Sequence, residues 1–167
     1  DLIDTAKLLA SQPLPRGRRV AIVGNSGGPQ AMAADACEDH GLIVPELPPG
    51  LIEARATAAV GNPVDLTADA TAAEIGAAVS ALVASPGTDV VLIVYTPPFG
   101  SGMQETCRAI AEATKTADKT VLACVAGHDT LIDGRVPAYA FPEQAIAALA
   151  RAVRYAEWRR GPARSAE

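Results

Sequence analysis

The hydrophobic positions of this chain fall into short continuous runs rather than into an alternating pattern. The clearest runs are Val-Ala-Ile-Val at 20–23 and Val-Val-Leu-Ile-Val at 90–94. A strand that faces water on one side alternates polar and apolar residues, whereas a strand buried on both faces is apolar throughout. The runs therefore predict buried strands at residues 18–25, 42–47, 89–95, 120–126 and 136–139.

Segments with helical spacing of apolar residues separate these runs. They predict helices at residues 2–11, 29–40, 71–84, 102–117 and 142–160, with a weakly helical stretch at 51–59. Pro29 and Pro142 suit the first turn of a helix, where a missing N–H costs nothing. Gly41 is a typical stop for the second helix, and Asp69 or Thr71 is expected to cap the third.

The alternation of strands and helices is typical of a parallel sheet with helices on both faces. About five strands in roughly 150 residues predict a flavodoxin-like, doubly wound α/β fold. Residues 1–160 are expected to form one domain, and residues 161–167 a polar linker towards a missing domain. Because the chain begins at Asp1 and ends in a polar tail, we interpret it as a piece of a longer protein.

The charge balance narrows the class of partner. The 167 residues carry 14 Lys and Arg against 19 Asp and Glu, a net charge of −5, which argues against nucleic acid because phosphate backbones attract clustered positive charge. No apolar run reaches the roughly 18 residues that a membrane span needs, so no membrane association is expected. Three widely spaced cysteines favour neither a disulfide framework nor a zinc site, and the cytoplasm is the simplest location.

The loop after the first strand carries the strongest chemical signal. It joins a buried strand to a helix, so backbone N–H groups and the positive end of the helix dipole meet at one point. Glycines allow an anion to approach the backbone closely, and we predict that Asn25, Ser26, Gly27 and Gly28 bind a phosphate or a carboxylate. The alternative is a tight turn that needs glycine for close packing of helix on strand. The loop has neither the P-loop pattern nor G-x-G-x-x-G, so a dinucleotide site is not supported.

Two further loops hold polar candidates. Asn62 and Asp65 lie in a stretch rich in turn formers at 61–66 and are possible loop contacts to a ligand. Alternatively, their side chains satisfy local backbone groups, as Asx residues usually do. His128 follows the fourth strand at the ligand-binding edge, but a histidine beside an aspartate is more often a surface or capping residue. No residue is assigned as catalytic and none as a metal ligand.

Several motifs in a fixed order resemble one enzyme family. They are LPRGRRVAIVGNSGGP at 14–29, GNPVDL at 61–66, YTPP at 95–98, VPAY at 136–139 and PEQA at 142–145. Over about residues 2–158 the chain resembles the NDP-forming acyl-CoA synthetases, which are related to succinyl-CoA synthetase. It looks like the second flavodoxin-like CoA-ligase domain of such an enzyme.

The resemblance implies a place in a larger acid–thiol ligase. Such enzymes interconvert acyl-CoA, ADP and phosphate with free acid, CoA and ATP through an acyl phosphate and a phosphorylated histidine. The implied partners are a CoA-binding Rossmann domain, the first flavodoxin-like domain, an ATP-grasp domain, and phosphate or acyl phosphate. ATP or ADP, CoA and Mg are expected in the parent protein, with no cofactor in this domain. The helix start at residues 25–28 would help to hold the phosphate of a phosphohistidine borne by another domain.

Departures from the family pattern limit what this chain is expected to do alone. The phosphorylated histidine of such enzymes lies in a Ser-His-Thr-Gly-like stretch, and the context of His128 does not match it. The isolated chain is therefore expected to be inactive. Gln30 stands where the family often has glycine, which narrows the expected pocket. An alternative function is a regulatory, ligand-sensing domain fused to a GNAT-type protein lysine acetyltransferase.

Overall fold

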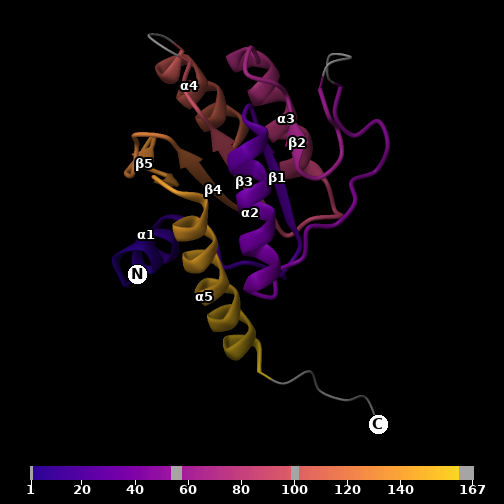
Figure 1. The fold of residues 1–167 in the computed structure, drawn as a ribbon. Helices are drawn as coiled ribbons and strands as arrows, with labels where there is room; N and C mark the ends of the chain where they lie inside the picture. Colours follow the sequence, from indigo (N-terminus) through magenta and orange to yellow (C-terminus); the bar gives the residue numbers. More distant parts are fainter. Residues whose placement is uncertain (1, 54–57, 99–101, 162–167) are drawn as a thin grey trace.

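The computed structural model describes residues 2–53, 58–98 and 102–161, and Figure 1 shows how their helices and strands are arranged. The elements alternate along the chain. In order they are α1 (Leu2–Ser11), β1 (Val20–Gly24), α2 (Gly27–Asp39), β2 (Val64–Asp65), α3 (Ala72–Ala84), β3 (Val90–Tyr95), α4 (Met103–Ala113), β4 (Thr120–Val125), β5 (Leu131–Ile132), β6 (Val136–Tyr139) and α5 (Pro142–Arg160).

The strands form one sheet in the order β2-β1-β3-β4-β6-β5. All neighbouring strands are parallel except β5, which runs antiparallel to β6. Because β2 and β3 flank β1 on opposite sides, the chain winds outwards from β1 in both directions. This confirms the predicted doubly wound α/β class, and the short antiparallel β5 makes six strands instead of about five.

Helices cover both faces of the sheet (Figure 1). α1, α2 and α5 pack on one face over a core that includes Leu92, and α3 and α4 pack on the other face over a core that includes Ile93. Successive residues of a strand point to opposite faces, so each strand supplies both cores. This is why the strands read as continuous apolar runs. In the described ranges, no helix combines the length and the apolar character needed to cross a membrane.

The edge of the sheet beside β1 differs from the sequence prediction. The strand expected at 42–47 is reduced to one bridge between Ile43 and Arg19, and the second strand is instead Val64–Asp65, where a turn was expected. Pro45 lacks the N–H that a continued ladder would need, so the pairing ends there. The predicted helical stretch at 51–59 is not helical in its described residues, and its residues 54–57 lie outside them.

The loop expected at 127–135 contains the short strand β5. Asp133 and Gly134 both have positive φ, 50° and 68°, and the Arg135 N–H donates to the Ile132 carbonyl at 3.0 Å. Asp-Gly is a strong hairpin signal, and here it lies between the apolar pair 131–132 and the apolar run that begins at Val136, so this strand could have been predicted. Of the predicted linker at 161–167, all but Gly161 lies outside the described residues.

Candidate anion-binding site at the start of α2

The carboxyl ends of β1 and β3 meet at one edge of the sheet, and α2 begins there (Figure 1). In a doubly wound sheet, ligands bind at this edge beside the strand at which the order reverses. The predicted site residues 25–28 follow β1 directly. The structure brings Asp65 to the same place, because Asp65 pairs with Gly24 at the end of β1.

The first turn of α2 presents its backbone to solvent. Ser26 is the N-cap with an extended backbone, and its side chain makes no capping hydrogen bond. Gly27 and Gly28 are exposed, and a Cβ added at Gly28 would meet no atom within 4 Å. The first N–H groups of a helix have no partner within the helix and carry about half a positive charge together. This end of α2 therefore has the geometry to accept an anion.

The side chain of Asn25 bonds the backbone of Thr96, the residue that follows β3. Its Nδ2 donates to the Thr96 carbonyl and its Oδ1 accepts from the Thr96 N–H, both at 2.9 Å. The backbone N–H of Asn25 donates to the Val94 carbonyl at 3.3 Å, and the residue is only 3% exposed. These bonds tie the ends of β1 and β3 together. Asn25 thereby sets the direction in which the loop leaves the sheet.

Asn62 is also committed to backbone groups. Its Oδ1 accepts from the Ile22 N–H at 2.9 Å, while Nδ2 donates to the carbonyls of Val20 and Pro45 at 3.0 and 2.8 Å. The side chain covers the part of β1 that lies between the Ile43 bridge and β2. The Asn62 amide therefore takes the place of strand backbone beside β1. This agrees with the alternative stated for this loop, in which the side chain satisfies backbone groups.

Asp65 places a negative charge beside the helix start. Its Oδ1 accepts from the Thr67 N–H at 2.9 Å, and its Oδ2 lies 2.9 Å from the position of a Cβ on Gly27. Thr67 has φ 73°, a strained conformation for a β-branched residue, and its hydroxyl donates to Asp69 at 2.6 Å. A carboxylate here stabilises the helix dipole and repels an incoming anion. No local sequence pattern reveals the strain at Thr67.

Gln30 fills the space between the first turn of α2 and the sheet. It is 1% exposed, its Nε2 donates to the Val64 carbonyl at 2.8 Å, and its Oε1 has no partner among the described residues. Gly24 lies against the same amide, since a Cβ on Gly24 would stand 3.1 Å from Gln30 Nε2. The buried Gln30 amide blocks access to the start of α2 from the side of the sheet. An anion can therefore approach the start of α2 only from the solvent side, at Gly28.

The buried cysteines Cys37 and Cys124 are not activated nucleophiles. Burial raises the pKa of Cys37 and of Cys124 to about 12, so both thiols stay protonated and unreactive at neutral pH. His128 is half-buried, with its Nε2 3.1 Å from the Thr130 hydroxyl. Within the described residues, no group of three or more His, Cys, Asp and Glu side chains could hold a metal ion.

Comparisons with known proteins point to one family of enzymes. No family model matches the chain. It is 34% identical to the alpha subunit of ADP-forming acetate–CoA ligase II from Pyrococcus furiosus, over 83% of this chain and 34% of that protein. It is 29% identical to the ADP-forming 4-hydroxybutyrate–CoA ligase of Nitrosopumilus maritimus, over 95% of this chain and 24% of that protein.

Solved structures agree with these relatives. A crystal structure from Pyrococcus horikoshii superposes with a TM-score of 0.84 at 30% identity, covering 93% of this chain and 39% of that one. The dinucleotide-forming acetyl-coenzyme A synthetase 1 of Candidatus Korarchaeum cryptofilum superposes with a TM-score of 0.80 at 25% identity, covering 92% of this chain and 36% of that one. A second structure of the latter protein is a complex with phosphate and ADP.

The doubly wound sheet, with a helix start open at its carboxyl edge, defines a flavodoxin-like α/β domain, and this fold matches part of an ADP-forming synthetase. Its homologues are the ADP-forming acetyl- and acyl-CoA synthetases, which are acid–thiol ligases, and this confirms the resemblance seen in the sequence. The chain spans only 24% to 39% of the length of the relatives and solved structures described above.

Proposed function

We propose that this chain is one domain of an ADP-forming acyl-CoA synthetase, in which the start of α2 helps to hold the phosphate of a phosphohistidine borne by another domain. The observation that carries this proposal is the exposed first turn of α2 at the carboxyl edge, with open space in front of Gly28. Relatives named as ADP-forming CoA ligases, and a structural neighbour solved with phosphate and ADP, support it.

The backbone of Ser26, Gly27 and Gly28 would supply the contacts. Their N–H groups and the positive helix end attract phosphate oxygens, while Pro29 has no N–H to donate. The side chain of Asn25 acts indirectly by holding the loop against Thr96. Nucleotide, CoA and Mg²⁺ would bind to other domains and supply the phosphoryl group and the thiol. This chain would orient the phosphate through its backbone N–H groups and attract it through the positive end of the α2 dipole.

The site is expected to bind phosphate weakly by itself. One helix start contributes about 1–2 kcal/mol when partly buried, and residues 25–30 contain no Lys or Arg. The carboxylate of Asp65 beside Gly27 lowers the affinity further. A second helix start from the histidine-bearing domain would roughly double the attraction and exclude water. Shared binding also suits a phosphoryl group that must leave for the next step.

Titration calorimetry with inorganic phosphate tests the shared site. The 167-residue chain should bind phosphate with a dissociation constant of about 1 mM or weaker, corresponding to ~4 kcal/mol or less. A longer chain that includes the histidine-bearing domain should bind more tightly. Asp65→Asn should strengthen binding, because it removes a like charge and keeps the acceptor for Thr67. Micromolar binding by the 167-residue chain would mean that the site is complete in this domain.

Substitution in the full-length synthetase tests the role of the backbone. Gly28→Val should lower phosphoryl transfer, since a β-branched side chain blocks the approach of an anion to the backbone. Ala31→Val is the matched control, because Ala31 is exposed on the same helix beyond the first turn. Thermal unfolding checks that both variants fold. Full activity in a folded Gly28→Val enzyme would exclude the phosphate role.

We also propose the domain boundaries, the partner domains and the cellular location of this chain. Residues 1–160 would form the CoA-ligase domain, with 161–167 leading towards an ATP-grasp domain. The CoA-binding domain and the first flavodoxin-like domain would be the other partners, in the cytoplasm. The names of the relatives support a synthetase, and nothing comparable supports the acetyltransferase fusion.

A further inference from the structure

A cavity of about 300 Å³ lies where the last turns of α5 meet the segment that leads into β1. It is lined by Leu14, Pro15 and Arg16 of that segment and by Ala156, Arg159 and Arg160 of α5. Three of these six side chains are arginines, although the whole chain carries a net charge of −5. The cavity therefore concentrates positive charge in an acidic protein.

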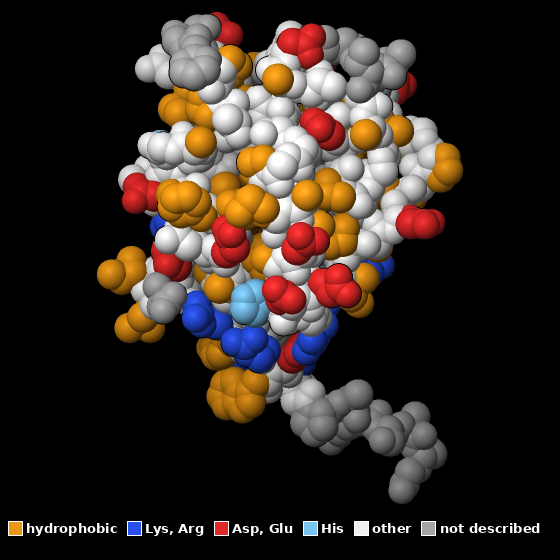
Figure 2. Space-filling view, viewed as in Figure 1, with side chains coloured by type: hydrophobic (Ala, Val, Ile, Leu, Met, Phe, Trp, Pro, Cys, Tyr) orange, Lys and Arg blue, Asp and Glu red, His pale blue; other side chains and the backbone are white. Residues whose placement is uncertain are grey.

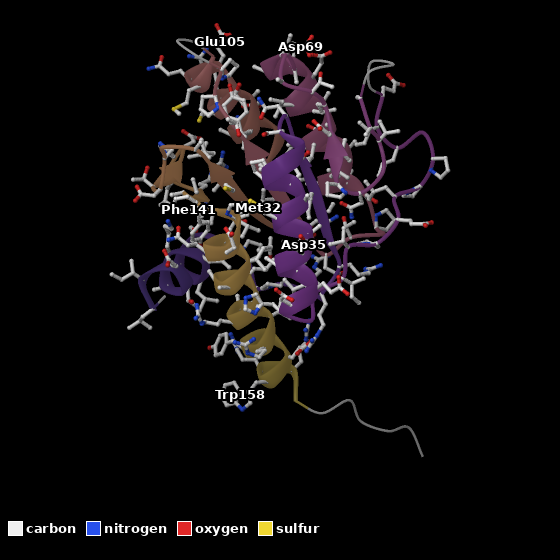
Figure 3. All side chains as sticks on the ribbon, viewed as in Figure 1. Met32, Asp35, Asp69, Glu105, Phe141 and Trp158 are labelled. Carbon is white, nitrogen blue, oxygen red and sulfur yellow. The ribbon has the colours of Figure 1, made fainter. Side chains whose placement is uncertain are left out.

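This cavity lies at the edge of the sheet opposite to the start of α2. α5 begins after β6 at the carboxyl edge and runs back along the sheet, so it ends at the amino edge, where the chain enters β1 (Figure 1). In Figure 3, Trp158 near the end of α5 lies at the bottom, whereas Asp69 and Glu105 lie at the top. Lys and Arg side chains gather in the same lower part of the molecule in Figure 2. A ligand in the cavity would leave the start of α2 open.

Arg159 lacks the close carboxylate partner that neighbouring arginines have. Arg18 donates to both carboxylate oxygens of Glu157 at 2.7 Å. Arg19 pairs with Asp89 at 2.8 Å. By contrast, Arg159 is exposed and forms no ion pair within the described part of the chain. Its charge is therefore available to a ligand.

Arg16 and Arg160 add two further charges beside it. Arg160 Nη1 donates to the Arg16 carbonyl at 2.6 Å, and this bond holds the guanidinium group against the loop. Arg16 pairs with Asp118 at 2.8 Å, but the two side chains are 65% and 76% exposed, so this pair is weak. Three guanidinium groups thus face one exposed carboxylate and the negative end of α5, which is equivalent to about half a charge. The balance favours an anion.

The remaining lining residues are apolar. Leu14, Pro15 and Ala156 have no side-chain group that forms hydrogen bonds, and they would gain from covering a ring or a short carbon chain. Guanidinium groups bind phosphate through paired N–H···O bonds. A volume of about 300 Å³ is at the small end of ligand pockets. The cavity therefore suits a small organic phosphate.

We propose that this cavity is a binding site for a small phosphate monoester. The phosphate group lies among the three arginines, and the apolar organic group lies against Leu14 and Pro15. Phosphate is favoured over carboxylate because a dianion gains more from three nearby cations. The ligand bridges α5 and the segment before β1, so its binding stabilises the fold. This proposal does not depend on the role of the α2 start.

Nuclear magnetic resonance titration of the 167-residue chain with phenyl phosphate tests the site. The largest amide shifts should fall at Leu14, Arg16 and residues 156–160, with a dissociation constant of about 1 mM or tighter. Inorganic phosphate lacks the apolar group and should bind the cavity about fivefold more weakly. Phenol lacks the charge and should leave these amides unmoved at the same concentrations. Shifts confined to residues 25–28 would overturn the proposal, and because each amide reports separately, they would do so without affecting the phosphate role of α2.

Three variants separate the cavity from a general effect of charge. Arg159→Gln should weaken binding of phenyl phosphate about tenfold, because it removes a charge that the ligand would pair with. Asp118→Asn should strengthen binding about twofold, because it removes the carboxylate that competes for Arg16. Arg154→Gln is the matched control, since Arg154 is an exposed arginine of α5 that does not line the cavity, and it should leave the dissociation constant unchanged.

Circular dichroism and thermal unfolding verify that the three variants fold, and phenyl phosphate should raise the midpoint of thermal unfolding of the wild type. Equal weakening by Arg159→Gln and Arg154→Gln would overturn the proposal, because it would show only a response to net charge. Absence of shifts around the cavity up to about 20 mM phenyl phosphate would overturn it as well.

Discussion

Three glycines around the candidate site differ in what surrounds them. A Cβ on Gly24 would stand 1.8 Å from the Val94 carbonyl oxygen, and a Cβ on Gly27 would stand 2.9 Å from Asp65 Oδ2. A Cβ on Gly28 would meet nothing within 4 Å. None of the three has a positive φ, so their surroundings rather than their backbone conformation distinguish them. Gly24 is required by packing, while Gly28 leaves room for a ligand.

Substituting these glycines by alanine should therefore have opposite effects on stability. Gly24→Ala should lower the free energy of unfolding by about 3 kcal/mol or more, because the new methyl overlaps a carbonyl that sheet pairing holds in place. Gly28→Ala should raise it by about 0.5–1 kcal/mol, since alanine is the better helix former and has space. Urea unfolding measures both. Similar losses in the two variants would contradict this distinction.

Asn62 should be among the polar residues most sensitive to substitution. Asn62→Ala removes bonds to the backbone of Ile22, Val20 and Pro45 and leaves the Ile22 N–H without its acceptor. We expect a loss of about 2–4 kcal/mol in the free energy of unfolding. Hydrogen exchange at the Ile22 amide should quicken more than exchange at Leu92 in the central strand. A loss below about 0.5 kcal/mol would show that another group covers this edge.

At the scale of the elements, α3 is held at both ends by specific groups. The Thr71 hydroxyl accepts from the Glu74 N–H at 3.2 Å, and the Glu74 carboxylate accepts from the Thr71 N–H at 2.8 Å. At the other end, Lys119 Nζ donates to the carbonyls of Leu82 and Ser85 at 2.9 and 2.6 Å. The ammonium group lies where the helix dipole is negative. Both ends satisfy groups that a helix cannot satisfy internally.

The capping box gives a prediction that a conservative variant can check. Thr71→Ala should lower the free energy of unfolding by about 1 kcal/mol, because the Glu74 N–H loses its acceptor. Thr71→Ser keeps the hydroxyl and should lose little. Thermal unfolding of the two variants side by side measures the difference. If serine destabilises as much as alanine, the methyl group of Thr71 and not the capping hydrogen bond is what matters.

For the molecule as a whole, stability should depend on pH through Asp89, which joins the starts of β1 and β3. Its oxygens accept from the Arg19 backbone N–H, Nε and Nη2 at 3.0, 3.0 and 2.8 Å. Hydrogen bonds from the Arg19 side chain are the main cause that holds the pKa of Asp89 below its usual 3.8. A carboxyl with a lowered pKa stabilises the fold above that usual value, and this contribution is lost as pH falls through the folded-state pKa.

We therefore expect Asp89→Asn to be less stable than wild type at pH 7 and to lose less stability on acidification. The difference between the two proteins should shrink below about pH 4. Urea unfolding at a series of pH values measures this. Asp118→Asn is the control, because its ion pair with Arg16 is exposed and contributes little. A constant gap between wild type and Asp89→Asn across the series would contradict the linkage.

The sequence alone determined the class of fold and the position of the candidate site. Continuous apolar runs can be stable only as strands buried on both faces, so β1, β3, β4 and β6 and the helices between them were predictable. Ser26-Gly27-Gly28-Pro29 directly after a buried strand predicted where α2 begins. These signals are local, because each depends on residues that are close neighbours along the chain.

Tertiary structure alone decided which polar groups near the site remain available. Asn25 and Asn62 looked like candidate ligand contacts, and the structure shows their amides bonded to backbone groups, 71 residues away in sequence for Asn25 and 17 to 42 residues away for Asn62. The choice of Val64–Asp65 over residues 42–47 as β2 likewise depended on which segment could pair with β1 next to the Asn62 side chain. Such pairings join parts of the chain that are distant in sequence. Every residue has the same backbone N–H and C=O groups, apart from the missing N–H of proline, so the sequence does not show which of them a side chain will bond. These pairings can therefore be identified only in the folded structure.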